Sequence, residues 1–199
     1  MTADLIDRIR LVRSPGIGPV TFRQLLARFG SAASALEAVP ELARRGGGAA
    51  PRLFSRGDAE REIARVEAFG GRYLTIGQGL YPFLLSQLDD APPLIIAKGQ
   101  LALLDRPAVA LVGARNASAA ACRFARTLAH DLGREGTVIV SGLARGVDSA
   151  AHDGALESGT IGVVAGGIDV FYPPENQPRQ EAMFERGLVL AEMPPGTEP

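Results

Sequence analysis

The 199-residue sequence contains a single cysteine, a single lysine and no tryptophan. Cys122 has no partner for an internal disulfide, and no cluster of cysteine and histidine with zinc-ligand spacing accompanies it. No apolar run approaches the roughly 20 residues that span a bilayer. Acidic residues and arginines occupy the N-terminus, where a secretory signal would be apolar. These absences argue against a disulfide-stapled secreted domain, a zinc module and a membrane protein, and they predict a cytoplasmic protein without a bound metal.

Charge is unevenly distributed, although the net charge is only −1. Residues 1–80 carry 12 Arg against 8 Asp and Glu, a difference of +4. Residues 81–199 carry 9 Lys and Arg against 14 Asp and Glu, a difference of −5. This balance argues against a broadly basic nucleic-acid binder. Any polyanion site in the second half must therefore be a local pocket.

The first third of the chain has only helical patterns. Apolar residues recur with helical spacing, and Gly- and Pro-containing breaks separate the segments. The predicted helices cover 3–13, 21–29, 31–38 and 58–69. We therefore predict a small all-helical domain over residues 1–70.

The break SPGIGPV, residues 14–20, has two interpretations. In the simpler one, its prolines and glycines end one helix and begin the next. In the other, a G-I-G hairpin between two helices presents backbone N–H groups to a DNA phosphate, as in helix-hairpin-helix motifs. Arg13, Arg23 and Arg28 lie nearby in the sequence. The simpler interpretation is favoured.

From residue 71 the pattern changes to short apolar strands that alternate with helices. Strands are predicted at 73–77, 93–99, 108–113, 137–142, 160–167 and 188–193. The alternation implies right-handed crossovers and a parallel sheet. Strands that are apolar throughout indicate that helices cover both faces. We predict the α/β class, with a Rossmann-like, mostly parallel sheet over residues 71–199.

Three strand ends of this sheet carry glycines and polar groups: VGARNAS (112–118), SGLARGVD (141–148) and AGGIDVFYPPEN (165–176). In a parallel sheet these ends meet at one edge, where ligands bind beside helix N-termini. Gly113, Gly142 and the Gly166–Gly167 pair are expected to expose backbone N–H groups there. Arg115 and Arg145 add positive charge. One glycine after a strand is often only a turn, but three such loops predict an anion pocket, with phosphate as the favoured ligand.

Candidate catalytic residues form no convincing set. His152 follows Asp148 by four residues on a predicted helix, so the two side chains could interact. A helix-capping aspartate beside a packed histidine is the favoured interpretation. Asp169 and Ser141 are the other candidates, and Ser141 lacks a G-x-S-x-G elbow. VGARNAS lacks the G-x-G-x-x-G dinucleotide fingerprint, so we expect no nicotinamide and no other cofactor.

Five segments, in this order, closely resemble the DNA-processing protein A (DprA, or Smf) family: LYPFLLSQLDDAPPLIIAKGQ, VGARNAS, VSGLARGVDSAAHDGAL, AGGIDVFYPPEN and LAEMPPGTEP. The likeness is strong over residues 79–199. It is weak over residues 1–70, where it implies a sterile-alpha-motif-like helical domain. The pattern SGLARG-[VI]-D-x-x-AH-x-x-AL followed by G-[IL]-D-x-x-YP-x-EN is highly specific.

The resemblance implies a binding protein and not an enzyme. Members of the family bind single-stranded DNA, load the RecA recombinase onto it during natural transformation, and help it past single-strand-binding protein. The resemblance also implies a homodimer for the full-length protein.

The same resemblance makes the pocket at the strand ends the DNA site. It implies that the arginine of VG-[SA]-R, here Arg115, is a principal phosphate ligand. The candidate nucleic-acid-binding residues are Gly113, Arg115, Ser118, Ser141, Gly142, Arg145, Gly146, Gly166, Gly167, Asp169, Asn176 and Arg179.

The chain departs from the family pattern at two positions and at its end. Ala114 replaces a serine or threonine, which removes a hydroxyl donor. Gln177 and Pro178 follow Asn176, where members often have a lysine, and Arg179 is the nearest cation. Family members continue beyond PPGTEP, so we expect this chain to be a fragment with an incomplete sheet and an apolar edge.

Two other functions compete with DNA binding. The first is a nucleotide-processing Rossmann hydrolase of the lysine-decarboxylase-like type. Its PGG-x-GT-x-x-E loop carries a catalytic glutamate, whereas AGGIDVFYPPEN has no acid at that spacing. The second is a purely structural interaction module, which would leave the three anion-type loops unexplained.

Overall fold

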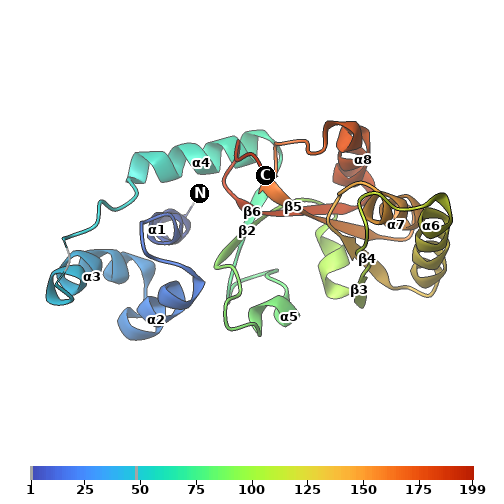
Figure 1. The fold of residues 1–199 in the computed structure, drawn as a ribbon. Helices are drawn as coiled ribbons and strands as arrows, with labels where there is room; N and C mark the ends of the chain where they lie inside the picture. Colours follow the sequence, from blue (N-terminus) through green and yellow to red (C-terminus); the bar gives the residue numbers. More distant parts are fainter. Residues whose placement is uncertain (1, 48) are drawn as a thin grey trace. The chain divides into compact units, whose positions relative to one another are not determined.

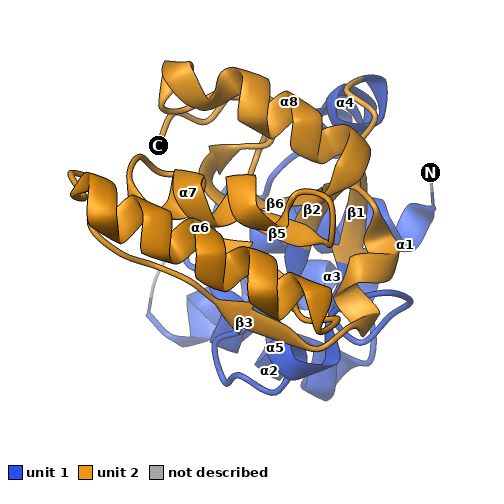
Figure 2. Ribbon diagram, turned by 90° about the vertical axis from the view of Figure 1, so that its right-hand side faces the viewer, with its two compact units in different colours: residues 1–68, 75–94 blue, residues 69–74, 95–199 orange. Residues whose placement is uncertain are grey.

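The structure is a computed structural model that describes residues 2–47 and 49–199. Its elements are labelled in Figure 1. The chain forms two units, which are coloured separately in Figure 2. Unit 1 extends to Ala68 and also includes Thr75–Leu94, and unit 2 comprises Phe69–Leu74 and Ile95–Pro199. The chain crosses between the units after Ala68, after Leu74 and after Leu94, so residues 75–94 group with the helical part.

Unit 1 is built from helices, as the sequence predicted. They are α1 (Ala3–Val12), α2 (Pro19–Phe29), α3 (Ala32–Arg45), α4 (Arg56–Ala68) and the short α5 (Phe83–Ser86). Hydroxyl groups cap two of them, because Thr2 Oγ1 accepts from Leu5 N and Ser31 Oγ accepts from Ser34 N. The apolar faces of α1, α2 and α3 meet around the fully buried Phe22.

The third helix is longer than predicted. The sequence placed its end near residue 38, but α3 continues to Arg45 through Pro40. Proline removes one hydrogen bond inside a helix. Val39 and Leu42, on either side of Pro40, both pack into the core of unit 1. This tertiary packing outweighs the local signal of the proline.

Unit 2 contains most of a six-stranded sheet in the order β1-β2-β6-β5-β4-β3. Strands β3, β4, β5 and β6 are parallel to one another, and β2 runs antiparallel to β6. The mostly parallel α/β sheet predicted from the sequence is confirmed. The strands are β1 (Arg72–Thr75), β2 (Leu94–Gly99), β3 (Ala108–Ala110), β4 (Val138–Ser141), β5 (Thr160–Gly167) and β6 (Leu188–Met193).

The long helices of unit 2 lie on one face of the sheet, not on both faces as predicted. Helices α6 (Ala119–Arg134) and α7 (Val147–Ala155) pack on Ile139, while Met183 of α8 (Gln177–Arg186) lies over Gly162. Ile139 and Gly162 point to the same side, because Ile139 pairs in register with Thr160. Figure 2 shows the three helices in front of the strands.

The strand order explains this one-sided arrangement. From β3 to β6 each strand is added on the same side of the one before it. Successive right-handed crossovers in one direction place their helices on one face, and only a reversal of direction would move a helix to the other face. Val163, on the opposite face, accordingly keeps 46% of its surface exposed. None of the helices in residues 2–47 and 49–199 is long and apolar enough to cross a membrane.

Small residues set the close packing of α6 against α7. Ala129 and Ala151 are fully buried between the helices and β4. A Cβ atom on Gly154 of α7 would lie 2.3 Å from the carbonyl oxygen of Arg126 and 3.1 Å from the Cβ of Ala129. At Gly154 the two helices are therefore so close that only a glycine fits between them.

We predict that Gly154→Ala destabilises unit 2. Alanine has the higher helix propensity, by roughly 1 kcal/mol, but relief of the clash with a backbone oxygen requires the helices to separate, and overpacking of this kind costs about 1–3 kcal/mol. Thermal unfolding followed by circular dichroism should show a Tm lower by several degrees. Gly57→Ala in α4 is the matched control, because its new Cβ meets only the flexible end of Arg61 at 3.4 Å. An unchanged or raised Tm for Gly154→Ala would contradict this packing.

Candidate functional site

A cavity of about 280 Å³ opens at the carboxyl edge of the parallel strands. All three loops singled out in the sequence contribute to its wall. The loop after β3 provides Arg115, the loop after β4 provides Gly142 and Arg145, and the end of β5 provides Gly166. These loops therefore form one pocket.

Arg115 is the most available cation of the pocket. Its side chain is exposed, and within the described part of the chain no ion pair or hydrogen bond joins its guanidinium to another residue. In particular, neither Asp148 nor Asp169 pairs with it; these carboxylates accept from Gly142 N and Gly196 N. The guanidinium is thus free to meet a ligand.

The backbone around Arg115 is held by close contact with the next loop. Gly146 has φ of +74°, and a Cβ atom there would lie 2.2 Å from Ala114 O and 2.7 Å from Arg115 O. Val147 N donates to Ala114 O at 3.3 Å. A Cβ on Gly113 would lie 2.7 Å from the side chain of Val147. Gly113 and Gly146 therefore allow two backbones to touch, which fixes the point from which Arg115 extends.

Arg145, the second cation of the pocket, forms an ion pair with Glu175. Both side chains are well exposed, at 60% and 51%. The hydrogen bond from Arg145 lowers the pKa of Glu175 below its usual value, so the carboxylate is charged at neutral pH. Glu175 did not stand out in the sequence, because nothing in YPPEN indicated which cation it would meet.

A buried carboxylate takes up backbone N–H groups that we expected to be exposed. Asp148, at 7% exposure, accepts from Gly142 N at 3.1 Å and from Ala144 N at 3.4 Å. Gly167 N likewise donates to Thr197 O at 2.8 Å. The prediction of free amides at Gly142 and Gly167 was therefore wrong. The positively charged groups that line the cavity are the guanidinium groups of Arg115 and Arg145.

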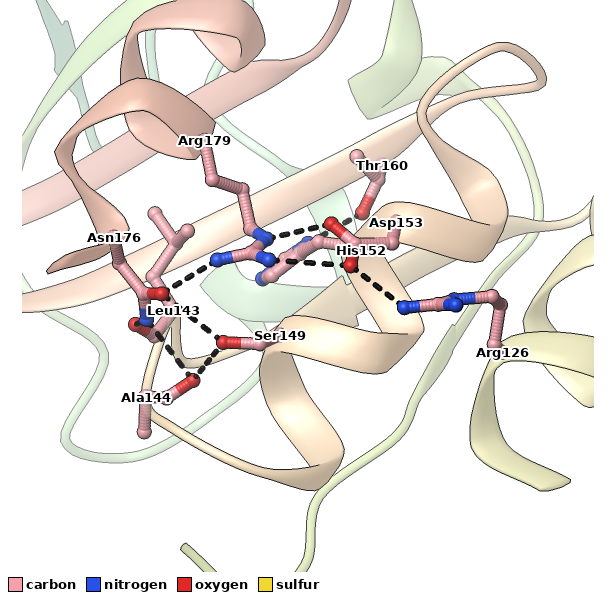
Figure 3. A network of polar contacts seen from close by, with 9 residues as sticks. All are labelled: Arg126, Leu143, Ala144, Ser149, His152, Asp153, Thr160, Asn176 and Arg179. Carbon is pink, nitrogen blue, oxygen red and sulfur yellow. Dashed lines mark hydrogen bonds and ion pairs between the residues drawn. The ribbon is translucent and has the colours of Figure 1, made fainter. Parts of the chain in front are cut away.

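The loop after β4 is also held by Asn176, at the end of the 3-10 helix that precedes α8, and by Ser149 of α7 (Figure 3). Asn176 is 5% exposed and donates from Nδ2 to Leu143 O at 2.7 Å and to Ala144 O at 3.2 Å. Ser149 Oγ donates to Ala144 O at 2.7 Å and contacts Asn176 Oδ1 at 3.2 Å. Asn176, a predicted ligand, thus shapes the loop from behind.

Leu143 adopts a conformation that leucine rarely takes. Its φ is +56°, which costs roughly 1–2 kcal/mol for a residue with a Cβ. Its side chain is completely buried and lies against Gly162, where a Cβ atom would approach Leu143 Cδ1 to 2.6 Å. Burial of the leucine over a glycine therefore offsets the backbone strain and keeps the loop in one shape.

Arg179 is engaged with acidic and amide groups and does not line the pocket. Its guanidinium pairs with Asp153 at 2.7 and 3.1 Å and donates to Asn176 Oδ1, and Asp153 also meets Arg126 at 3.0 Å (Figure 3). Burial by itself would raise the pKa of Asp153, but the hydrogen bond and charge of Arg179, with a smaller contribution from Arg126, lower it. Arg179 therefore holds α8 to α7 in this structure.

The remaining predicted residues make internal hydrogen bonds. Ser118 Oγ caps α6 by accepting from Ala121 N at 3.2 Å. Ser141 Oγ donates to Leu111 O at 2.6 Å, and Asp169 Oδ1 accepts from Gly196 N at 2.7 Å. These three side chains support the walls of the pocket, and their contact with a nucleic acid stays a prediction.

His152 is a packed histidine, the interpretation favoured from the sequence. It is completely buried, and its Nδ1 lies 2.7 Å from Thr160 Oγ1. Because that hydroxyl donates to Ile139 O at 2.9 Å, Nδ1–H is the donor to Thr160 and Nε2 has no partner among the described residues. Burial lowers the pKa of His152 to about 4. Asp148 bonds to the loop, and no hydrogen bond joins it to His152.

The sequence missed several contributors to the pocket wall, among them Val170, Tyr172 and Pro173. Tyr172 is 54% exposed. The sequence indicated the loops through their glycines and arginines. It did not indicate these apolar wall residues, because their position depends on how the turn after β5 folds back. Pro199 also lines the cavity.

Comparison with known families places the chain. Residues 72–199 match the family described as DNA recombination-mediator protein A, and residues 2–64 match the DprA-like N-terminal HHH domain. The chain belongs to the DNA recombination-mediator protein A family. The resemblance to the DprA/Smf proteins stated from the sequence motifs is thereby confirmed.

Curated relatives in several bacteria carry the same names. The chain is 46% identical to DNA processing protein DprA of Streptococcus pneumoniae over 152 residues, which cover 74% of this chain and 52% of that protein. It is 30% identical to protein Smf of Synechocystis over 197 residues, covering 92% of this chain and 50% of that protein. The chain thus spans about half the length of these relatives.

Two solved structures have the same fold. The X-ray structure of DprA from Streptococcus pneumoniae superposes with a TM-score of 0.77 at 29% identity, covering 98% of this chain and 69% of that one. DprA from Helicobacter pylori, described as having a unique single-stranded DNA binding mode, gives a TM-score of 0.57 at 35% identity and covers 64% of this chain and 59% of that one.

We predict that buried His152 makes the protein less stable in mild acid. The unfolded chain takes up a proton near pH 6.5, whereas the folded protein does so at about pH 4. Between these values the unfolded state binds more protons, so the free energy of unfolding falls as the pH falls from about 6.5 to about 4. The loss reaches roughly 3 kcal/mol, at 1.36 kcal/mol for each pH unit.

Urea unfolding at several pH values measures this loss, and His152→Gln should flatten the profile. A second test does not require His152→Gln to fold. It uses the variant His130→Gln, in which His152 is the only histidine. Its imidazole proton resonance should then titrate near pH 4. A midpoint near 6.5 would show that the ring is accessible to solvent.

Proposed function

We propose that the pocket at the carboxyl edge of the sheet binds the backbone of single-stranded DNA, and that the chain acts as part of a recombination mediator. The observation that carries the proposal is the unpaired guanidinium of Arg115 in a cavity shared by three loops. A planar guanidinium matches two phosphate oxygens, so it is suited to a phosphodiester.

The local placement of positive charge supports a phosphate ligand. Residues 81–199 carry a net charge of −5. The surface of this half as a whole therefore does not attract DNA, and any attraction must come from a local cluster of positive charge. The described residues that line the pocket nevertheless include Arg115 and Arg145 and no aspartate or glutamate. A phosphate group is therefore directed to this edge of the sheet.

The size and walls of the cavity favour a single strand over a duplex. About 280 Å³ accommodates a phosphate with part of one nucleotide, whereas a duplex backbone keeps its bases paired and inaccessible. The exposed ring of Tyr172 offers an aromatic surface on which an unpaired base can stack, a contact that does not depend on sequence. We therefore expect binding without strong sequence preference.

Binding is a better account of this pocket than hydrolysis of a nucleotide. Glu175, which pairs with the pocket residue Arg145, is exposed and engaged in that ion pair. His152 is buried away from solvent, and Asp148 is committed to two backbone amides. None of these is poised as a general base toward a substrate. A nucleoside-monophosphate hydrolysis assay beside a single-strand gel shift separates the two functions.

The proposal extends to partners by way of the family. Relatives named DNA processing protein DprA and the family described as a recombination mediator support a role in recombination. We propose that single-stranded DNA held in this pocket is delivered to the RecA recombinase during natural transformation, with single-strand-binding protein displaced indirectly. We also propose that the full-length protein acts as a homodimer.

We predict that Arg115→Ala weakens binding to an oligothymidylate by roughly 10- to 150-fold. A charge-assisted contact to phosphate contributes about 1.5–3 kcal/mol, and each 1.4 kcal/mol is a factor of about ten. Gel shift or fluorescence anisotropy measures the change. Arg115→Lys should recover only part of the loss, because lysine lacks the planar fork.

The control is Arg134→Ala, which removes the same charge from the far end of α6. Thermal unfolding of both variants must stay close to that of the parent chain. An unchanged affinity for Arg115→Ala would remove Arg115 from the site. If Arg115→Ala lost both its affinity for DNA and its cooperative unfolding transition, Arg115 would have a structural role instead.

We predict that the affinity for single strands falls as the salt concentration rises, with a slope set by the number of phosphates that the protein contacts. Each contact contributes about −0.7 to the slope of log K against log salt concentration. Arg115→Ala should therefore flatten the slope of the parent chain by about 0.7, and duplex DNA of the same length should bind more weakly than the single strand. A slope near zero, or equal affinity for duplex and single strand, would overturn the proposed mode of binding.

A further inference from the structure

The ion pair between Arg145 and Glu175 places a carboxylate where an anionic ligand would be expected. Arg145 lines the cavity and Glu175 covers its guanidinium from the 3-10 helix η2 (Pro174–Asn176). A carboxylate is the protein group most similar to a phosphate in charge and in its two acceptor oxygens. This pair is unusual in a pocket that otherwise presents an unpaired arginine.

We propose that Glu175 is an intramolecular competitor of the DNA phosphate for Arg145. In the free protein the carboxylate of Glu175 is paired with the guanidinium of Arg145. A phosphodiester must displace this carboxylate before it can bind Arg145, the second cation of the pocket. This inference rests on the proposed function, because it presupposes that the ligand is single-stranded DNA. It assigns to Glu175 a role in setting the affinity for single-stranded DNA, which the presence of this glutamate in the family motif does not by itself indicate.

The backbones on both sides of the ion pair are tied together. Asn176, the neighbour of Glu175, donates to Leu143 O at 2.7 Å and to Ala144 O at 3.2 Å, and Ala144 is the neighbour of Arg145. The two charged side chains therefore start from fixed positions a short distance apart. The ion pair reforms easily whenever the ligand leaves.

The side chains themselves are free to separate. Arg145 is 60% exposed and Glu175 is 51% exposed. Exposed ion pairs contribute little to stability, so a phosphate with its full negative charge can replace the carboxylate. The ion pair between Arg179 and Asp153 is different, because its side chains are only 21% and 34% exposed and it joins two helices. Of these two pairs, the one in the pocket is the exchangeable one.

Displacement has two consequences for binding. The carboxylate released from Arg145 stays near the bound phosphate and repels it, which lowers affinity. In addition, Arg145 is already neutralised before DNA arrives, so it contributes less to the release of counterions. Arg115 makes the first contact without competition, and Arg145 joins only a ligand that is already held there.

The experiment compares Glu175→Gln with the parent chain in binding to a fluorescein-labelled oligothymidylate, measured by anisotropy across a salt series. Glutamine keeps the shape and one acceptor oxygen but removes the charge. We expect binding to be tighter by about 3- to 10-fold at low salt, since screening in an exposed site keeps the effect of one charge modest. The salt slope should become steeper by up to about 0.7, and the two affinities should converge at high salt.

The matched control is Glu157→Gln. Glu157 forms a similar exposed ion pair with Arg186, and its loss changes the net charge by the same amount away from the pocket. A second test places Glu175→Gln in an Arg145→Gln background, where the gain should largely disappear if Glu175 acts through Arg145. Thermal unfolding should be unchanged by Glu175→Gln, because the bonds of Asn176 still hold the loop.

The outcomes distinguish this inference from the proposed function. If the parent chain binds the oligonucleotide and Glu175→Gln binds equally well, or as Glu157→Gln does, the competitor role is refuted while DNA binding stands. Weaker binding by Glu175→Gln would show that the carboxylate orients Arg145 for the ligand, which also refutes competition. If the parent chain does not bind single strands at all, the proposed function itself fails.

Discussion

Contact between two backbones at Gly146 is the constraint on which the pocket depends. The carbonyl groups of Ala114 and Arg115 approach so closely that a Cβ on Gly146 would lie within 2.2 to 2.7 Å of them. This contact joins the loop after β3 to the start of α7, and so it ties Arg115 to the same element that carries Asp148 and Ser149. A larger residue at this position would push the loops apart and move Arg115 away from Arg145. The glycine thus sets the positions from which the two cations extend.

The loop after β4 is shaped by groups below and beside it, which leaves its outer surface open. Asp148 accepts its amides, while Ser149 and Asn176 bind its carbonyls. Buried polar groups need such partners, because an unsatisfied amide or carbonyl costs about 1–3 kcal/mol. With the backbone satisfied from inside, the charged side chain of Arg145 is the part of the loop that faces outward. The same bonding explains why amide groups expected to bind anions are not available for that purpose.

Much of the fold could be predicted from the sequence, because strands and helices of unit 2 differ in period and are separated by glycines. The one-sided placement of α6, α7 and α8 could not, since apolar strands look alike whether one face or both are covered. It follows from strand order, which no local pattern contains. The loops of the site were found by their glycines, but the partners of each arginine were not. Arg179 and Arg145 look equivalent in the sequence, and only the fold shows that Arg179 is held by Asp153 and Asn176.

The availability of each cation is therefore set by its surroundings and not by its residue type. Arg115 has no partner in the described chain, Arg145 has an exposed carboxylate partner, and Arg179 has a partly buried one. Ligand binding must replace whatever partner an arginine already has, so these three residues form a graded series from open to committed. A net negative charge over this half of the chain limits attraction to other surfaces. In the proposed mode of binding, preference for one edge of the sheet therefore comes from the arginines that lack internal partners. On this proposal a substitution of an acidic residue alters binding as a substitution of a basic one does.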